Sequence, residues 1–231
     1  MNANRKTAII VGVFFILGFA GIPSVVLTGP ILDTPDYLSK FSANENQVLT
    51  GALFELIMAV ACANIAIWLY PVLKKHNEPL ALGSVGFRII EAVLFFVAAI
   101  GLLSLLTLSQ EYVKAGAPDA SHIQTTGALL LAAREAANNL GFMAFTLGAL
   151  MYYYIFYQSK LVPRWLSGWG FLAAALSLSA ALLVLFGEEP FSTKTIILNI
   201  PIALQEMVLA VWLIVKGFNP SAIASGSAKQ I

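Results

Sequence analysis

Residues 80–106 read LALGSVGFRIIEAVLFFVAAIGLLSLL, and in this stretch only Arg88 and Glu91 are charged. A helix rises about 1.5 Å per residue, so these residues would form a helix about 40 Å long. The hydrocarbon core of a bilayer is about 30 Å thick and is crossed by about 20 helical residues. Backbone groups in lipid must find their hydrogen bonds within the segment. The stretch is therefore predicted to be a transmembrane α-helix.

Five more stretches share this character, which gives six predicted spans at residues 7–27, 48–70, 80–106, 126–157, 166–186 and 195–215. The sequence therefore predicts an all-α, polytopic membrane protein, built as a bundle of about six transmembrane helices. We expect a single domain over residues 1–218 and a short disordered cytoplasmic tail over residues 219–231, because the tail is small and polar.

The composition supports a protein whose solvent is lipid. Only 11% of the residues are charged, 59% are hydrophobic and the mean hydropathy is +0.83, whereas a soluble domain carries about 25% charged residues. The net charge of +1 argues against a nucleic-acid partner. The uncharged stretch 7–32 is longer than the apolar region of a signal peptide, about 7–15 residues, so it is predicted to be a retained helix.

Lysine and arginine are distributed unequally between the two sets of loops. One set holds eight of them and the other holds three. The first set is Arg5, Lys6, Lys74, Lys75, Lys160, Arg164, Lys216 and Lys229, and the second is Lys40, Lys114 and Lys194. Because cytoplasmic loops carry the excess of positive charge, both termini are predicted to lie in the cytoplasm. The loops near Asp36, Asp119 and Glu188 are then expected to face outward.

Aromatic residues gather at the boundary predicted to face the cytoplasm. They are Trp68, Tyr70, Tyr152, Tyr153, Tyr154, Tyr157, Trp165 and Trp169. Amphipathic rings prefer the membrane–water interface, so this set is interpreted as an interfacial belt.

Charged side chains also occur inside the predicted spans, where each costs about 2.5–3.5 kcal/mol at the bilayer centre. They are Glu55, Arg88, Glu91, Arg134, Glu135 and Glu206. We expect them to face the bundle interior and to pair with one another. Helical spacing places Asn138 and Asn139 beside the pair at 134 and 135, and Asn199 two turns from Glu206. The simplest arrangement is one polar network near the midplane that contains all of these residues.

Four carboxylates and two guanidiniums would leave a charge of −2 in a site of low dielectric constant if all of them were ionised. At least one glutamate is therefore predicted to hold a proton, or a cation to sit among them. The leading hypothesis is a site that binds a small solute, a lipid or a proton, in a transporter-like or sensor-like protein. A transporter of six helices would be expected to form a homodimer. The alternative is a non-catalytic scaffold or partner protein in which the charges only fix helix packing.

An intramembrane acid–base enzyme that uses paired glutamates is the third hypothesis. The sequence holds no His-Glu-x-x-His, Gly-x-Ser-x-Gly or Cys-x-x-Cys motif. His76 and His122 fall in loops on opposite sides of the membrane, and Cys62 is the only cysteine. No cofactor, no metal site and no intrachain disulfide are therefore predicted.

Several segments resemble a known protein family. They are residues 87–92 (FRIIEA), 161–167 (LVPRWLS) with Trp169 and Gly170, Pro201, Glu206 and Met207, and residues 212–214 (WLI) and 216–218 (KGF). They are similar to a bacterial membrane family, domain-of-unknown-function family 4386, from the first helix to about Phe218. The resemblance implies the fold and a bacterial source, hence the inner (plasma) membrane. The family has no assigned activity, so Arg88, Glu91 and Glu206 are motif positions without roles.

Overall fold

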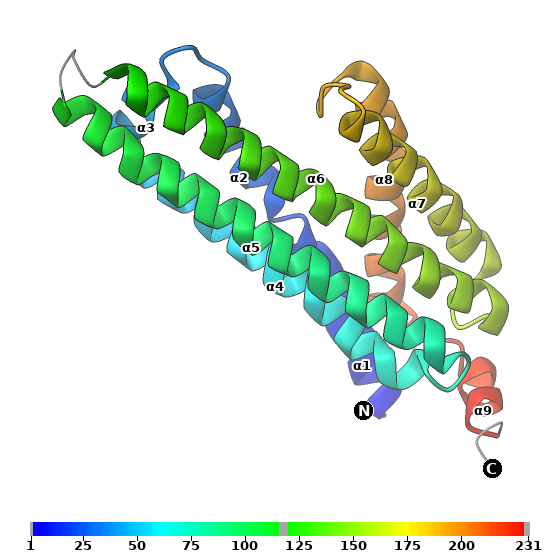
Figure 1. The fold of residues 1–231 in the computed structure, drawn as a ribbon. Coiled ribbons are helices and arrows are strands. Elements are labelled where there is room, and N and C mark those ends of the chain that lie inside the picture. The colour runs from blue at the N-terminus through cyan, green and yellow to red at the C-terminus, as the bar shows by residue number, and fades with distance from the viewer. Residues whose placement is uncertain (1, 116–119, 229–231) are drawn as a thin grey trace. The chain divides into compact units, whose positions relative to one another are not determined.

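The computed structural model describes residues 2–115 and 120–228, and within these ranges every regular element is a helix. Figure 1 shows the helices in chain order. They are α1 (Ala3–Gly18), α2 (Gly21–Leu32), α3 (Tyr37–Ala43), α4 (Glu45–Leu73), α5 (Glu78–Ala115), α6 (Ala120–Ser159), α7 (Arg164–Leu185), α8 (Thr193–Val215) and α9 (Pro220–Ala228).

Six segments of the described chain are long and apolar enough to cross a membrane, which confirms the predicted all-α, six-span architecture. The first segment, Ala3–Leu32, joins α1 and α2, and the other five are α4 to α8. Large apolar side chains such as Val26, Leu82, Ile100 and Leu172 are exposed by 60% or more. Such a surface cannot face water over whole helices, so the chain is a multi-pass membrane protein.

The first span is interrupted because of Pro23. Its ring lacks an N–H and clashes with the carbonyl of the residue four positions earlier, which is Phe19. The helix breaks at that point, between the end of α1 at Gly18 and the start of α2 at Gly21. The Ile22 N–H donates instead to the Phe19 carbonyl over 3.0 Å. The interruption lies one turn before the proline.

Helices α5 and α6 extend beyond the spans that hydropathy predicts. Helix α5 ends at Ala115 instead of Leu106, and α6 begins at Ala120 instead of Thr126. The additional turns are polar, so an apolar window does not detect them. At their far ends Lys114 and Glu111 pair within one turn over 3.2 Å, which supports a solvent-exposed helix end. Asp119, predicted in the loop between them, lies outside the described residues.

The predicted disordered tail is wrong for residues 220–228, which form α9. Helix α9 begins with Pro220, a residue suited to the first turn of a helix. Its Ala222 is buried in the same apolar core as Phe218 and Leu161, and this packing stabilises a segment that composition alone marks as polar. Residues 229–231 of the predicted tail lie outside the described residues.

The chain forms two compact units. Unit 1 consists of residues 1–17, 61–92 and 139–231, and unit 2 consists of residues 18–60 and 93–138. The core of unit 1 is aromatic and includes Phe15, Tyr152, Tyr153 and Phe156, whereas the core of unit 2 is built around Phe41, Val48 and Leu102. The prediction of a single domain over residues 1–218 stays a prediction.

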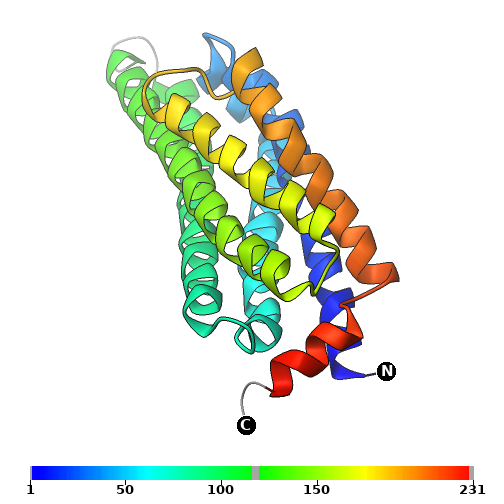
Figure 2. The same cartoon turned by 90° about the vertical axis from the view of Figure 1, so that its right-hand side faces the viewer.

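Within unit 1, helices α7 and α8 run side by side in both views (Figure 1 and Figure 2). The buried face of α7 is made of small residues, which include Ala173, Ala174, Ser177 and Ala181. Membrane helices associate through such faces because small side chains let the backbones approach closely.

The carboxyl end of α8 is held by Arg5. The Arg5 guanidinium donates to the carbonyls of Leu213 over 3.0 Å and Val215 over 3.1 Å, and to that of Ile214. Terminal carbonyls of a helix lack intrahelical partners and carry partial negative charge, so a cation there is stabilising. Gly217 follows with a φ of +76°, and a Cβ at this position would lie 3.0 Å from the guanidinium.

We expect Arg5→Met to lower the free energy of unfolding by about 1–3 kcal/mol, because three carbonyls lose a charged donor. The measurement is a denaturant titration of the purified protein in detergent. The matched control is Lys6→Met, which removes an exposed charge next to it and should change stability by less than about 0.5 kcal/mol. Equal effects of the two substitutions would contradict a specific role for Arg5.

Candidate functional site

The site in unit 1 begins with a polar stripe on α5. Ser84, Arg88 and Glu91 follow one another at helical spacing and are 1%, 1% and 2% exposed. The Nε atom of Arg88 lies 3.0 Å from Oε2 of Glu91 and donates to the backbone carbonyl of Cys62 on α4 over 3.1 Å. The buried ion pair that the sequence predicted at positions 88 and 91 is therefore present.

Helix α6 provides the space that the Arg88 side chain needs. A Cβ at Gly148 would lie 3.2 Å from Cγ and 3.3 Å from Cδ of Arg88, so only glycine leaves the arginine stem undisturbed. One turn earlier, the ring of Phe145 lies 5.0 Å from the guanidinium carbon. This is cation–π distance, and the interaction is stronger in a dry environment. Helix α6 thus packs closely against both the stem and the guanidinium of Arg88.

The pairing of Arg88 is incomplete. Among the described residues, its Nη1 atom makes no hydrogen bond, although that atom is buried. Glu91 Oε2 likewise receives no well-aligned hydrogen bond, so its contact with Arg88 is an ion pair only. A buried donor without an acceptor costs about 1–3 kcal/mol. Such a group in a native structure commonly marks a place for water, an ion or a proton-bearing ligand.

A second carboxylate, Glu206 of α8, belongs to the same cluster. It is half-buried, and its Oε1 accepts a hydrogen bond from the Tyr152 hydroxyl over 3.3 Å. Tyr152 lies one turn after Gly148, the residue of α6 that packs against the Arg88 stem, so Glu206 is bonded to the same face of α6 that Arg88 contacts. The neighbouring Gln205 accepts a hydrogen bond from Tyr153 and donates to the Leu166 carbonyl over 3.1 Å. We call Arg88, Glu91, Tyr152 and Glu206 the unit 1 cluster.

Gly170 of α7 leaves the space that the ring of Tyr153 occupies. Gly170 faces the ring of Tyr153 so closely that any side chain at position 170 would overlap it. The rings of Tyr152 and Tyr153 lie 4.5 Å apart, and both side chains are fully buried. Both were predicted in an interfacial belt, and that interpretation is wrong for these two residues. The belt prediction suits Tyr154 and Tyr157, which are 44% and 43% exposed.

The unit 1 cluster carries one guanidinium and two carboxylates, so its formal charge is −1 when all three groups are ionised. A buried charge without a partner is costly, and carboxylates that share a site resist joint ionisation. Binding one proton makes the cluster neutral. Chemically, a cluster of two carboxyl groups and one guanidinium can take up and release a proton.

Unit 2 contains a second buried charge pair, which, unlike the unit 1 cluster, is balanced in charge. Arg134 of α6 donates through both terminal nitrogens to Glu55 of α4, with 2.9 Å between Nη1 and Oε2. Its Nη1 also donates to the Ala98 carbonyl over 2.6 Å, and the Ser24 hydroxyl donates to Glu55 over 3.0 Å. A bidentate pair of this kind is geometrically specific. The pair is balanced in charge and well supplied with hydrogen bonds.

A glycine also makes room for this pair. A Cβ at Gly101 of α5 would lie 3.1 Å from Cβ of Arg134, so the two helices approach closely at that point.

The remaining predicted site residues do not all face the interior. Glu135 is exposed, so its predicted interior position is wrong: adjacent helical residues point about 100° apart, and Arg134 occupies the inward direction. Asn138, Asn139 and Asn199 are half-buried. Asn139 donates to the Ala181 carbonyl over 3.2 Å, and Asn199 Oδ1 has no hydrogen-bond donor among the described residues.

Five of the nine predicted residues thus enter two sets of contacts, one in each unit. Arg88, Glu91 and Glu206 belong to the unit 1 cluster, and Glu55 pairs with Arg134 in unit 2. The prediction of one network for all of them stays a prediction. The sequence interpretation missed Tyr152, Gln205 and Ser24, because uncharged polar residues within apolar spans are common. The spacing of Gly148 and Tyr152, one turn apart on α6, was the available signal.

Within residues 2–115 and 120–228, no group of three His, Cys, Asp or Glu side chains is close enough to hold a metal ion. Comparisons with known proteins give one family. The model for the family described as "Domain of unknown function (DUF4386)" matches residues 10–217. No curated protein matches the chain, and no solved structure matches it. The matched segment covers most of the first span, all of the other five and both charge pairs, so this membrane protein belongs to the DUF4386 family.

Proposed function

We propose that this protein binds and releases a proton inside the membrane, at the unit 1 cluster, as a proton-coupled transporter or a membrane pH sensor does. The observation that carries the proposal is that the unit 1 cluster holds two carboxyl groups, Glu91 and Glu206, but one guanidinium, Arg88, whose ion pair is with Glu91. An intramembrane ionisable residue is by default a functional hypothesis. Here the surplus carboxylate gives that hypothesis a specific chemistry, because the neutral state of the cluster contains one proton.

Two features support proton binding over the binding of a larger solute. Arg88 and Glu91 are almost completely enclosed, so a proton is a ligand of suitable size. The Tyr152 hydroxyl on Glu206 is a polar neighbour that can both donate and accept a hydrogen bond. The excess of lysine and arginine in one set of loops supports both termini in the cytoplasm. Six spans are few for a transporter, so a homodimer belongs to the same proposal.

A scaffold function is the second candidate, and the Glu55–Arg134 pair favours it. Its groups are balanced in charge and hydrogen-bonded, which is the pattern of a pair that fixes helix register. We propose this structural role for the unit 2 pair alone.

The test is infrared spectroscopy of the purified protein in lipid at neutral pH. We expect the carbonyl stretching band of a protonated carboxyl group, which ionised carboxylates lack. Glu206→Gln or Glu91→Gln should remove this band, because either substitution leaves one carboxylate for one guanidinium and no surplus charge. Exchange into heavy water identifies the band by its shift.

The control is Glu135→Gln, which removes an exposed carboxyl group from the same membrane protein and should leave the band unchanged. A parent protein without such a band would contradict the proposal. So would a band that persists in both the Glu91 and the Glu206 variant.

A further inference from the structure

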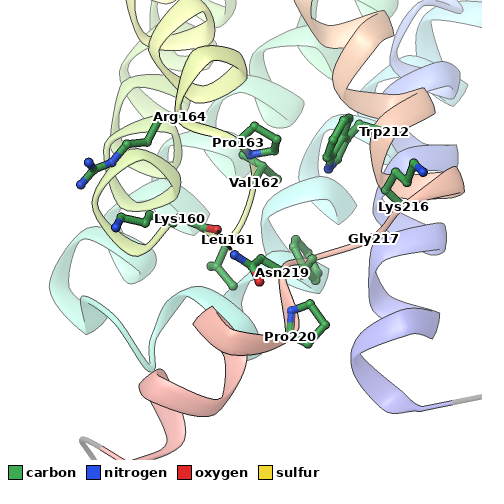
Figure 3. A pocket seen from close by; sticks show the side chains of 11 residues that line it. Lys160, Leu161, Val162, Pro163, Arg164, Trp212, Lys216, Gly217, Asn219 and Pro220 are labelled. Atoms are coloured by element: carbon green, nitrogen blue, oxygen red, sulfur yellow. Dashed lines mark hydrogen bonds between the residues drawn. The ribbon is translucent and has the colours of Figure 1, made fainter.

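A groove of about 580 Å³ lies in unit 1 between the loop that joins α6 to α7 and the segment that follows α8. Figure 3 shows Lys160 and Arg164 on one side of this groove and Trp212 and Lys216 on the other. Its inner wall is apolar and includes Val162, which is buried. The volume falls within the range of small-molecule sites, about 300–1,000 Å³.

The position of the groove relative to the apolar spans fixes its depth in a membrane. Helix α7 begins at Arg164 and α8 ends at Val215, and both helices are membrane spans. Groove residues 160–164 directly follow the end of α6 at Ser159, and groove residues 216–220 directly follow the end of α8 at Val215. The groove therefore lies at the level of lipid headgroups. Trp212 and Trp165 form an edge-to-face pair with 6.4 Å between ring centroids. Tryptophan is enriched at this level of a membrane.

The groove is positively charged and its charges are uncompensated. Lys160, Arg164 and Lys216 line it and no acidic residue does. Across the part of the chain that the structure describes, none of these three cations forms an ion pair with a carboxylate. The amino end of α7, which lies in the groove, adds the partial positive charge of a helix N-terminus.

The neighbouring helix end does not offset this charge. The carboxyl end of α8 would bring partial negative charge, but Arg5 already donates to its last carbonyls. The groove is therefore left with an attraction for anions.

The backbone holds the two walls in place before any ligand arrives. The Asn219 N–H donates to the Leu161 carbonyl over 2.9 Å, and its side chain reaches the Lys160 carbonyl over 3.4 Å. Lys160 itself has a φ of +58°, in the left-handed region that is strained for a non-glycine residue. This turn connects the end of α6 to the start of α7 beside the groove. A preformed site loses less entropy on binding than a flexible one.

We propose that this groove binds the phosphate-bearing headgroup of an anionic phospholipid. The phosphate is held by Lys160 and Lys216 at the amino end of α7, while the Arg164 guanidinium contacts Tyr157 and adds positive charge nearby. The buried apolar wall contacts the glycerol and the first methylene groups. A basic pocket at the ends of membrane helices, with tryptophan beside it, has the chemistry that recognises anionic lipid headgroups. The site is independent of the proton-binding cluster and does not rest on the proposed function.

The test compares lipids on the purified full chain in detergent, with phosphatidylglycerol and phosphatidylcholine as probes. Native mass spectrometry counts the bound lipids, and a thermal melt measures stabilisation. We expect phosphatidylglycerol to bind more tightly than phosphatidylcholine and to raise the melting temperature more. The double variant Lys160→Glu with Lys216→Glu should weaken phosphatidylglycerol binding roughly tenfold or more, because each lysine near an anionic headgroup contributes about 1 kcal/mol.

The matched control is Lys6→Glu with Lys74→Glu, which makes the same change of charge in loops predicted on the same side but away from the groove. It should keep the preference for phosphatidylglycerol. Equal losses in the two double variants would overturn a specific site in favour of general surface charge. Equal binding of the two lipids by the parent would overturn it as well. Stabilisation by inorganic phosphate alone, at the same groove, would overturn the lipid as the source of the phosphate.

Discussion

Arg88→Met is expected to lower the free energy of unfolding by about 3–5 kcal/mol, because it leaves Glu91 as a buried carboxylate without its cation. Methionine preserves most of the volume of the arginine stem, so the cavity term is small. The cost arises from charge: the guanidinium that pairs with Glu91 is gone, and the cluster keeps two carboxyl groups and no cation. A denaturant titration in detergent measures the loss.

A double variant separates this charge effect from simple loss of packing. Arg88→Met with Glu91→Leu replaces the direct ion pair by apolar groups of similar size, and such replacements are often neutral or stabilising. We expect the double variant to recover most of the stability that the single variant loses. Glu206 remains, and a bound proton can neutralise it. A double variant as unstable as Arg88→Met would show that the packing of the arginine stem against Gly148 dominates.

The control is Arg164→Met, which removes an exposed guanidinium that contacts the backbone and ring of Tyr157. Its expected effect is below about 0.5 kcal/mol. A similarly small effect of Arg88→Met would contradict a dry, charge-paired cluster and would point to water around the guanidinium.

The six spans could be predicted from sequence because the hydropathy of a long uninterrupted stretch is enough to identify each of them. A stretch such as residues 80–106 has to be helical in lipid whatever its neighbours are, since its backbone has no other hydrogen-bond partners. The ends of helices are decided differently. Beyond Leu106 the chain is polar, and helix α5 continues to Ala115 through local pairs that a hydropathy window does not measure. Helix α9 forms because Ala222 finds a core to pack against.

The site could be predicted in part, because charge burial is visible in sequence but helix rotation is not. Arg88 and Glu91 lie on one helix face, so their pairing followed from spacing. Arg134 and Glu135 are adjacent and point in different directions, and only contact with α4 and α5 determines which of them faces inward. Tyr152 and Tyr154 differ in the same way: the first bonds to Glu206 in the core, and the second is exposed.

Matching glutamine substitutions should distinguish the structural pair from the proton site. Glu55→Gln is expected to cost about 3–5 kcal/mol, because Arg134 is only 7% exposed and would lose its counter-ion. The Ser24 hydroxyl and the Ala98 carbonyl can still bond to the amide and the guanidinium, but they carry no net charge. The free energy of unfolding, from a denaturant titration in detergent, reports the loss.

Glu206→Gln is expected to leave stability unchanged or raise it, within about 1 kcal/mol of the parent. The substitution removes the surplus carboxylate of the unit 1 cluster and keeps an acceptor for the Tyr152 hydroxyl. Glu135→Gln, at an exposed position, is the control for both variants: it measures how much a glutamate-to-glutamine change alters the free energy of unfolding when no buried contact is lost. Equal, large losses from the Glu55 and Glu206 variants would mean that both glutamates serve helix packing, and the scaffold hypothesis would then hold for the whole protein. A large loss at Glu55 alone leaves Glu206 as a carboxyl group that the fold does not need, and a bound proton then accounts for its place in the unit 1 cluster.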